Sequence, residues 1–562
     1  MEKLRVGILL DSLEITAWEY EMIERIVNGN YAEIVLVVKK RSAQVPDRSL
    51  PGLLKRNLNL WMYKLYMAGE RVITKPAPDA FAKKNLNGLI NNATLLEVDC
   101  VEKKFSDYIR PEDIDVIKGY KVDVFIRLGF RILRGEILKT AKMGVWSYHH
   151  GDNHKYRGGP AAFWEVFRQE RQIGSVLQIL TEDLDGGEVL YRSYSSVLST
   201  VKATMNNYYW KTALFIPRKL QELHRAGEDS FFRNISNQNG HPNFYSGRNY
   251  TLPRNSEFLK LFFPRVWNVI KKKIGNLFHF EQWILLYAFS ENDSFSKSLF
   301  RYKKIIPPKD RYWADPCVVK KGEKYFIFFE EVIYGKTKER GHICVMEIDK
   351  KGKRSEPVII LQKPYHLSYP FVFEYKGEFY LIPESEENST IELYRAVHFP
   401  YEWEFKMNLM ENIKAVDSTV FFKDDKCWLF ANVRELEGTS YSEELFLFST
   451  DDLLSGRWRS HPANPVVSDV GSSRPAGRIF SENGKWYRPS QDCSLRYGHS
   501  MAINEITELS ESSYRESKVS GIYPEWDKKL VATHTFSFDK GLSVVDALIR
   551  RRKRWLSFSQ NL

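Results

Sequence analysis

The stretch "ADPCVVKKGEKYFIFFEE" (Ala314–Glu331) decides the fold of the second half of the chain, because its pattern returns four times. In most copies two short apolar strands flank a turn of glycine, lysine or aspartate. The other copies are "SYPFVFEYKGEFYLIPES" from Ser368, "VDSTVFFKDDKCWLFANV" from Val416, "SRPAGRIFSENGKWYRPSQD" from Ser473 and, more weakly, "THTFSFDKGLSVVDAL" from Thr533. A repeat of roughly 48 to 60 residues predicts four-stranded blades, and five copies predict an all-β five-bladed propeller.

The repeat also predicts which side chains line the centre of this propeller. The innermost strand of each blade lines a channel, so the second position of each copy should form a ring. That ring is Asp315, Tyr369, Asp417, Arg474 and His534, and the end of the following strand adds Glu330, Glu384, Asn432 and Gln491. These positions stay polar while their chemistry changes, which favours a mixed binding site. The alternative is that they cap turns and satisfy backbone groups.

Two family resemblances attach to these copies. "ADP" and "VDSTVFFKDD" resemble first- and third-blade motifs of arabinanase-type glycoside hydrolases, which implies acid–base roles for Asp315 and Asp417 together with a glutamic acid. Arg474 stands where that glutamate is sought, so Glu330 or Glu384 would have to substitute.

The second resemblance is more extensive. "HLSYPFVF", "IELYRAVHFP", "HPANPV", "SRPAGR" and "YRPSQDCSLRYG" are similar, in this order, to segments of the N-terminal domain of the plant glucosamine inositolphosphorylceramide transferase family. This resemblance implies handling of a glycan or glycolipid. Arg474, Arg478 and Arg488 would suit a phosphate or carboxylate on such a ligand, and salt bridging is the alternative.

The first half of the chain alternates strands with helices. "LRVGILL", "AEIVLVV" and "VDVFIRLG" are buried-strand patterns, and "ITAWEYEMIERIV" between the first two is apolar at helical spacing. This βαβ order predicts an α/β open parallel sheet. No GxGxxG follows the first strand, so a dinucleotide site is not expected. We expect an α/β domain over 1–205, a helical connector over 206–290 and the propeller over 291–550.

One segment of the first half carries chemistry. "VWSYHHGDNHKYRGGPAAFW" (145–164) and "ILTEDLDGGEVL" (179–190) resemble the catalytic core of the folate-dependent formyltransferases, which include methionyl-tRNA and sugar N-formyltransferases. Ser147 stands at the family's asparagine position and His149 at its histidine. The resemblance implies catalytic roles for Ser147, His149 and Asp185, and binding of N10-formyl-tetrahydrofolate by Tyr156, Arg157, Gly158 and Gly187.

Two departures from this pattern matter. Serine is a shorter and poorer oxyanion donor than asparagine. The family's apolar loop has become the polar Gly151–His154. Three outcomes stay open: a different cofactor, a substitute donor such as His150 or His154, or a fold that binds without transfer. A metal site at His149, His150, Asp152 and His154 is a further alternative, but we expect none.

Composition restricts the partners. The net charge is +12, which favours anionic partners, and no nucleic-acid motif accompanies it. The five cysteines are scattered and indicate reduced thiols in a cytoplasmic protein. No run is apolar enough to span a membrane, but the basic segment 259–289 could contact the inner face of a membrane peripherally. Packing against a domain is the alternative.

Three functions therefore compete. The first is formyl transfer to an amino sugar, with the propeller binding a nucleotide-sugar or glycolipid substrate. The second is an altered, non-catalytic formyltransferase fold coupled to a carbohydrate-binding propeller. The third is a propeller that is itself a glycosyltransferase or glycosidase.

Overall fold

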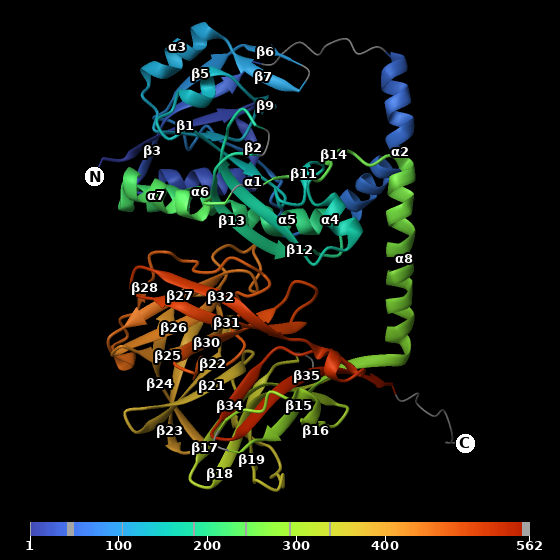
Figure 1. The fold of residues 1–562 in the computed structure, drawn as a ribbon, viewed down its shortest axis with the longest axis vertical. Helices are drawn as coiled ribbons and strands as arrows, with labels where there is room; N and C mark the ends of the chain where they lie inside the picture. Colours follow the sequence, from blue (N-terminus) through green and yellow to red (C-terminus); the bar gives the residue numbers. More distant parts are fainter. Residues whose placement is uncertain are drawn as a thin grey trace. The chain divides into compact units, whose positions relative to one another are not determined.

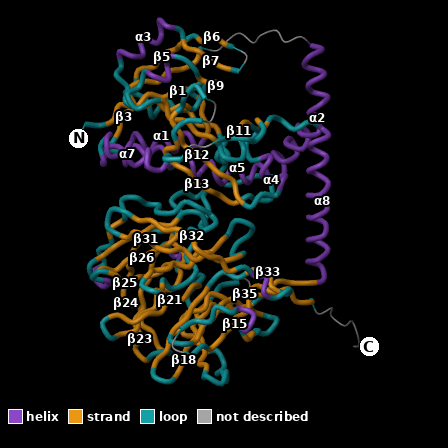
Figure 2. The backbone as a smooth tube through the Cα atoms, viewed as in Figure 1, coloured by secondary structure: helices purple, strands orange, loops and turns teal. Residues whose placement is uncertain are grey.

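The computed structural model describes residues 2–41, 50–103, 105–183, 186–241, 244–291, 294–335 and 339–553. Two compact units divide the chain. The first comprises Met1–Arg265 with Leu436–Thr439, and the second comprises Val266–Glu435 with Ser440–Leu562. Figure 1 shows that the first unit mixes helices with strands, whereas the second consists mainly of strands, as Figure 2 shows by secondary structure.

A seven-stranded sheet forms the centre of the first unit. Its order is β13 (Val189–Ser196), β12 (Gln172–Ile179), β10 (Val145–His149), β8 (Val124–Arg127), β1 (Leu4–Leu10), β3 (Ala32–Lys40) and β5 (Thr94–Val98). The five strands from β10 to β5 run parallel, β12 pairs antiparallel with β10, and β13 pairs antiparallel with β12. The predicted parallel sheet is therefore mixed at one edge.

Helices cover both faces of this sheet, because its central strands are apolar on both sides. Val6 and Ile8 belong to one buried cluster and Leu9 to the other. The first cluster contains residues of α1 (Ala17–Val27), α6 (Phe215–Ala226) and α7 (Glu228–Gln238), and the second contains residues of α3 (Pro111–Gly119). A Thr16–Glu19 capping box starts α1. The remaining helices are α2 (Leu50–Ile73), α4 (Phe163–Arg168), α5 (Val201–Thr212) and α8 (Asn255–Phe278).

The predicted connector over 206–290 needs correction. Its first part joins the first unit, because Trp210, Phe215 and Phe231 lie in the same buried cluster as the sheet. Its last part is not helical: residues His279–Phe289 form strand β15, which pairs along its whole length with β35 (Leu542–Arg552). The helical part of the predicted connector therefore ends with α8, at Phe278. Neither α8 nor any other helix among the described residues is long and apolar enough to cross a membrane.

Five sheets make up the second unit, among the residues described. Four of them are consecutive antiparallel sheets: β17 (Arg311–Lys321), β18 (Lys324–Ile333), β19 (His342–Ile348) and β20 (Val358–Leu361); β21 (Ser368–Tyr375), β22 (Glu378–Glu384), β23 (Thr390–His398) and β24 (Glu402–Glu411); β25 (Ala415–Lys423), β26 (Lys426–Val433), β27 (Leu445–Thr450) and β28 (Arg459–Ser460); β29 (Phe480–Glu482), β30 (Lys485–Asp492), β31 (Ser500–Leu509) and β32 (Tyr514–Ile522). The fifth combines β15 and β16 (Lys303–Ile305) with β33 (Leu530–Ala532), β34 (Phe536–Asp539) and β35. Each predicted repeat copy contributes to a different sheet.

The core of the second unit lies between successive sheets. Each of five buried clusters joins one sheet to the next, and the cluster containing Leu285, Val318 and Val544 joins the fifth sheet to the first. The sheets therefore pack in a closed, propeller-like ring. β15, near the start of the unit, pairs with β35, near its end, so the fifth sheet closes the ring.

Candidate functional site

The same backbone irregularity places one side chain from each of the first three sheets. The strand register shifts between Ala314 and Cys317, between Ser368 and Phe371, and between Val416 and Thr419. Within each shift one residue has a left-handed backbone: Asp315 (φ 52°), Tyr369 (φ 42°) and Asp417 (φ 53°). Side chains other than glycine rarely adopt this conformation, and bulges of this kind re-aim a side chain. Three repeats thus retain a strained geometry at the position predicted to line the centre.

The two predicted rings are neighbours across each sheet. Ala314 pairs with Glu330, Ser368 with Glu384 and Val416 with Asn432. In the fourth sheet the Gln491 N–H donates to the Arg474 carbonyl at 2.7 Å. Apart from Glu384, whose side chain is 13% exposed, all the predicted channel residues are buried: Asp315, Glu330, Tyr369, Asp417, Asn432, Arg474, Gln491 and His534.

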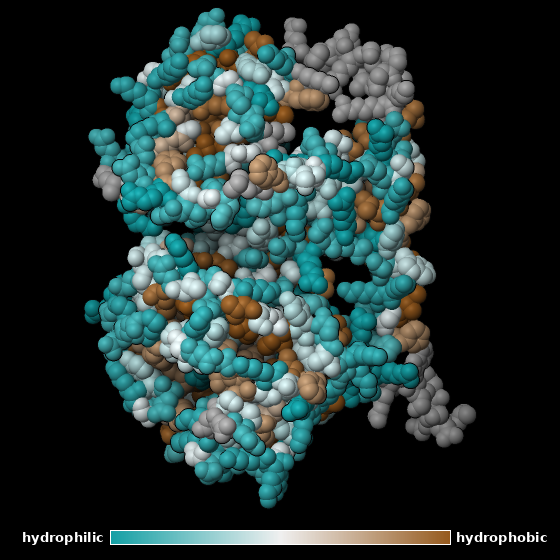
Figure 3. All heavy atoms as spheres, viewed as in Figure 1, coloured by the Kyte–Doolittle hydropathy of each residue, from teal (hydrophilic) through white to brown (hydrophobic). Residues whose placement is uncertain are grey.

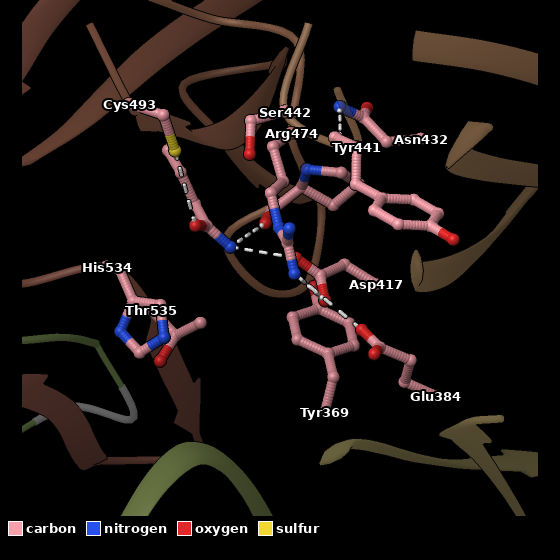
Figure 4. A network of polar contacts seen from close by, with 12 residues as sticks. Tyr369, Glu384, Asp417, Asn432, Tyr441, Ser442, Arg474, Cys493, His534 and Thr535 are labelled. Atoms are coloured by element: carbon pink, nitrogen blue, oxygen red, sulfur yellow. Dashed lines mark hydrogen bonds and ion pairs between the residues drawn. The ribbon is translucent and has the colours of Figure 1, made fainter. Parts of the chain in front are cut away.

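Asp417 is at the centre of the polar network shown in Figure 4. Arg474 donates to its carboxylate twice, through Nε at 2.6 Å and Nη2 at 3.2 Å, and Gln491 Nε2 donates at 2.8 Å. Arg474 Nη2 also lies 3.7 Å from Glu384 Oε2. One guanidinium therefore serves two carboxylates from different sheets.

The environment of Glu384 changes its pKa. Burial raises the pKa of Glu384 well above its usual value, and the nearby charge of Asp417 raises it further, against the lowering effect of Arg474. Asp417 accepts the charge-assisted hydrogen bonds that stabilise a carboxylate. A glutamic acid with a raised pKa beside a carboxylate that accepts charge-assisted hydrogen bonds is an arrangement that suits proton transfer.

A second buried group surrounds His534. Its Nε2 lies 3.2 Å from Asp315 Oδ1, and its Nδ1 lies 2.8 Å from Asp546 Oδ2. Burial alone would lower the pKa of His534, but the charges of Asp546 and Asp315 raise it to about 9. Burial raises the pKa of Asp315 to about 8, although His534 opposes that change. The imidazolium is thus held between two acids.

Asp546 is a residue that the sequence prediction missed. It occupies the second-ring position of the weak fifth copy, within "VVDAL", and that place in the repeat was the available signal. Its carboxylate accepts the backbone N–H groups of Asp315, His534 and Thr535 at 2.9–3.0 Å. These bonds and the neighbouring charge of His534 outweigh burial and lower the pKa of Asp546.

The other predicted channel residues have local partners. Tyr312 donates to Glu330 at 3.0 Å, and the Tyr369 hydroxyl accepts the Gly477 N–H at 2.8 Å. Asn432 donates to the Tyr441 carbonyl at 2.9 Å. Structural support therefore explains these three positions as well as ligand binding does.

Two of the predicted arginines have hydrogen-bond partners within the protein. Arg488 is buried and donates to both oxygens of Glu516 at 2.7 and 2.6 Å, and Arg478 donates to the Val372 carbonyl at 2.6 Å. The salt-bridge alternative therefore holds for Arg488. Arg474 remains beside Tyr497, whose half-exposed ring lies 4.9 Å from the guanidinium carbon.

Two buried triplets among the described residues have ligand atoms close enough for a metal ion. They are Asp315, His534 and Asp546, and Glu331, His342 and Cys344. Protein contacts already account for the second, since Glu331 accepts from Trp313 at 2.8 Å and lies 3.1 Å from His342 Nε2. The histidine-rich loop of the first unit is not among these groups, because Arg192 lies between Asp152 and His154 there.

In the first unit, the predicted catalytic residues follow one strand. Ser147 and His149 both lie on β10, near the carboxyl edge of the parallel strands, where open α/β sheets bind ligands. The Ser147 hydroxyl accepts from Arg127 Nη1 at 3.1 Å, and His149 Nε2 donates to the Tyr156 carbonyl at 2.8 Å. Asp185 lies outside the described residues. His150 stacks 3.9 Å from Tyr209, and burial lowers its pKa to about 3, so its imidazole is neutral and offers one N–H donor.

Glu165 is a second residue that the prediction missed. It directly follows Trp164, the last residue of the quoted motif, lies on α4 and is buried. Burial raises its pKa to about 7, and the charge of His149 moderates that rise. A carboxyl group that titrates near neutral pH is suited to accept or donate a proton.

The predicted cofactor residues separate into packing and cavity roles. Tyr156 donates to Glu170 at 2.7 Å. Gly158 (φ 92°) pairs within β11 (Arg157–Gly158) against β14 (Asn249–Tyr250), where a Cβ would lie 2.3 Å from the Tyr250 oxygen. Arg157 and Gly187 line a cavity of about 590 Å³ together with Asn153, His154, Gly186, Glu188, Val189, Arg192, Gln238, Asn239 and His241. This cavity is polar and basic.

Comparison with known proteins separates the two units. Residues 306–535 match the family model "Glucosamine inositolphosphorylceramide transferase 1, N-terminal". The protein of that name from Arabidopsis thaliana is 34% identical over 215 residues, which are 37% of this chain and 27% of the relative. The protein from Oryza sativa subsp. japonica is 35% identical over 210 residues, 37% of this chain and 28% of its own. Most of the second unit is therefore similar to the N-terminal part of this transferase family. The chain spans little more than a quarter of the length of these relatives.

The first unit has weaker matches. Methionyl-tRNA formyltransferase from Chlorobium chlorochromatii is 24% identical over 94 residues, 17% of this chain and 30% of the relative.

Among solved structures, Zg3597, a family 117 glycoside hydrolase from Zobellia galactanivorans, has a TM-score of 0.32 at 12% identity, covering 50% of this chain and 93% of its own. Glycinamide ribonucleotide transformylase 1 from Symbiobacterium toebii has a TM-score of 0.24 at 15% identity, covering 38% and 85%. Formyl transfer stays a prediction.

Proposed function

We propose that the chain is a transferase of glycan or glycolipid biosynthesis, and that its second unit is a five-bladed β-propeller that holds the sugar near its centre. One observation carries the proposal: Arg474 bridges Asp417 and Glu384 within a buried network, and burial raises the pKa of Glu384. Glu384 retains some exposure, and the half-exposed ring of Tyr497 lies beside Arg474. Aromatic rings and convergent polar groups are what a sugar ligand requires.

The relatives' names suggest which sugars to try. They specify glucosamine and inositolphosphorylceramide, so an amino sugar and an inositol phosphate are the ligand classes that we propose for this chain. In such a complex the neutral Glu384 would donate a proton to a departing oxygen, while Asp417 would stabilise developing positive charge. The alternative is that the propeller only binds its glycan.

The test is calorimetry on the full chain with glucosamine, N-acetylglucosamine and their uridine diphosphate derivatives. Asp417→Asn should weaken binding at least about tenfold, because a charged acceptor is lost. Asp451→Asn is the matched control, since Asp451 forms an exposed ion pair with Arg459 in the same sheet. Glu384→Gln keeps a neutral side chain, so it should preserve binding and abolish turnover only if the propeller is catalytic. Equal binding by Asp417→Asn and the control would refute the site.

We propose further that the first unit transfers a formyl group to an amino sugar, with N10-formyl-tetrahydrofolate supplying the formyl carbon. The residues present fit the anionic end of that cofactor, because Arg157 and Arg192 line the basic cavity. Glu165, with a pKa of about 7, would accept the proton that the attacking amine loses. Arg127, bonded to Ser147, would supply the donor that the missing asparagine provides in the family.

This second proposal is tested separately. Calorimetry with 5-formyl-tetrahydrofolate should detect binding to the full chain, and Arg192→Met should weaken it. Glu165→Gln should lower kcat about 10²-fold while leaving KM unchanged, as expected for loss of a general base. Glu136→Gln, at the start of a surface turn, is the control. Absence of folate binding by a folded chain would remove formyl transfer and leave the glycan proposal standing.

A further inference from the structure

We propose that Gln178 is a second catalytic donor of the first unit, beside Arg127, and that its carboxamide replaces the one that Ser147 lacks. The inference rests on the formyl transfer proposed above. Ser147 pairs with Arg127 of β8 on one side and with Gln178 of β12 on the other. Residues directly opposite one another in a sheet carry their side chains on the same face. The three residues therefore form one row across three strands, and the 3.1 Å hydrogen bond from Arg127 to Ser147 lies within it.

The carboxamide oxygen of Gln178 is buried and has no hydrogen-bond partner among the described residues. Gln178 is 1% exposed, whereas polar side chains on the surface, where hydrophilic atoms predominate (Figure 3), can bond to water. Its neighbours Leu177 and Ile179 pack in or against the first buried cluster, so Gln178 points to the opposite face of the sheet. A buried polar group without a partner costs stability, and a ligand that bonds to it is one explanation for its presence.

This carboxamide lies beside the cavity that we propose for the folate. A Cβ on Gly187 would lie 3.7 Å from Gln178 Oε1, and Gly187 lines that cavity of about 590 Å³. Opposite residues on adjacent strands have Cβ atoms about 4.5–5.5 Å apart. The long side chain of Gln178 is therefore within reach of the place where the family's asparagine carries its carboxamide, next to Ser147.

The two histidines that the sequence left open as substitute donors lie elsewhere. The ring of His150 contacts those of Trp18 and Tyr209, which pack in or against the first cluster, on the face opposite the row. His154 Nε2 lies 2.9 Å from Arg192 Nη2. Neither histidine belongs to the row that contains the serine.

The role of Gln178 follows from where negative charge develops. When an amine attacks a formyl carbon, an electron pair of the C=O bond moves onto the formyl oxygen. Gln178 Nε2–H donates to that oxygen after a half turn of the carboxamide, which breaks no hydrogen bond at Oε1. The electron pair then re-forms the C=O bond as the bond from carbon to the leaving nitrogen breaks. Glu165 accepts the proton of the amine and passes it to that nitrogen.

The experiment compares Gln178→Met with Gln172→Met in the full chain. Gln172 is the matched control, because it lies on the same strand and the same face, about 20 Å along β12. With N10-formyl-tetrahydrofolate and glucosamine, Gln178→Met should lower kcat about 10²–10³-fold. Its calorimetric affinity for 5-formyl-tetrahydrofolate should stay nearly unchanged, because the oxygen gains its charge only during the reaction. Adding Ser147→Asn to Gln178→Met returns a carboxamide to the neighbouring strand and should recover part of the lost rate.

Two readouts do not depend on the acceptor. Without ligand, Gln178→Met should leave the stability of the first unit to urea unchanged or raise it, because a buried carboxamide without a partner is removed. With 10-formyl-5,8-dideazafolate that carries ¹³C in its formyl group, infrared spectroscopy measures hydrogen bonding to the C=O directly. Its stretching band should move to lower frequency on binding to the unmodified chain and to Gln172→Met, and should move less on binding to Gln178→Met.

The outcomes separate this inference from the function on which it rests. An equal band shift in Gln178→Met and Gln172→Met overturns the role of Gln178 and leaves formyl transfer standing. A loss of stability in Gln178→Met alone would instead mark a structural glutamine, and it also overturns the proposal. Absence of folate binding by the folded, unmodified chain removes formyl transfer itself, and this proposal with it.

Discussion

Replacing Arg474 by methionine should destabilise the second unit by about 3–5 kcal/mol. The guanidinium donates to Asp417 at 2.6 and 3.2 Å and lies 3.7 Å from Glu384. Its side chain is 9% exposed, that of Asp417 2% and that of Glu384 13%. Methionine fills similar space without charge, so the cost arises from a buried carboxylate that retains Gln491 as a donor but has lost its cation.

This cost should depend on pH with a definite sign. Without Arg474, its lowering effect on the pKa of Glu384 is lost, so this pKa in the folded state rises still further above the value of about 4 in the unfolded chain. The folded state then binds more protons, so stability falls as pH rises from about 4 through the folded-state pKa. The deficit of the variant should therefore shrink on acidification. Arg474→Met combined with Asp417→Asn should recover part of it at neutral pH, because the stranded charge is gone.

Urea unfolding of the full chain at pH 5 and pH 8 measures the loss of stability, and calorimetry measures the Tm of the second unit. The expected fall in Tm is on the order of 10 °C at neutral pH. Arg459→Met is the control, because its exposed pairing with Asp451 and Glu511 is worth at most about 1 kcal/mol. A deficit equal to that of the control, or one that stays constant between the two pH values, would falsify the assignment of Arg474 as the cation that stabilises the cluster.

Three further predictions address other parts of the molecule. The second unit should lose stability as pH rises from about 6.5 to about 9, since the raised pKa of His534 contributes fully below that window and not above it; thermal unfolding across pH measures this. Asp546→Asn should lower the pKa of His534 by at least about one unit in an imidazole NMR titration, and an unchanged value would exclude the pairing. Gly187→Ala should destabilise the first unit by about 2 kcal/mol or more, because its Cβ would lie 1.9 Å from the Ile179 oxygen, whereas Gly119→Ala meets nothing within 4 Å and should be tolerated.

The repeat made the second unit predictable in unusual detail. Period-two strands and a turn in each copy were enough to locate Asp315, Tyr369 and Asp417 at equivalent places, because a bulge retains its place within a repeated structure. The left-handed backbone of these residues was not predictable, since nothing in aspartate or tyrosine demands it. The contacts of this backbone are not local either: the Asp315 N–H donates to Asp546, 231 residues later.

Other parts could not be inferred from local pattern. The sequence of β15 resembles the end of a basic apolar segment. Its strand partner β35 lies more than 250 residues later, so the pairing is not visible in the local sequence. Arg488 is a residue type suited to ligand binding, yet it is paired with Glu516 on β32, two strands away in the same sheet. In each case a tertiary partner overrides local propensity, as expected where long-range pairing decides the structure.

The contrast between the two units follows from where each holds its polar groups. In the first unit the polar groups of the motif already have partners in the protein: Ser147 accepts from Arg127, and His149 donates to the Tyr156 carbonyl. In the second unit a strained backbone and a buried arginine hold acids together that would otherwise repel one another. Strain and buried charge both cost stability, and a fold retains them where a site needs them. The geometry of the second unit therefore supports ligand binding more strongly than that of the first. For the first unit, the decisive measurement is folate binding.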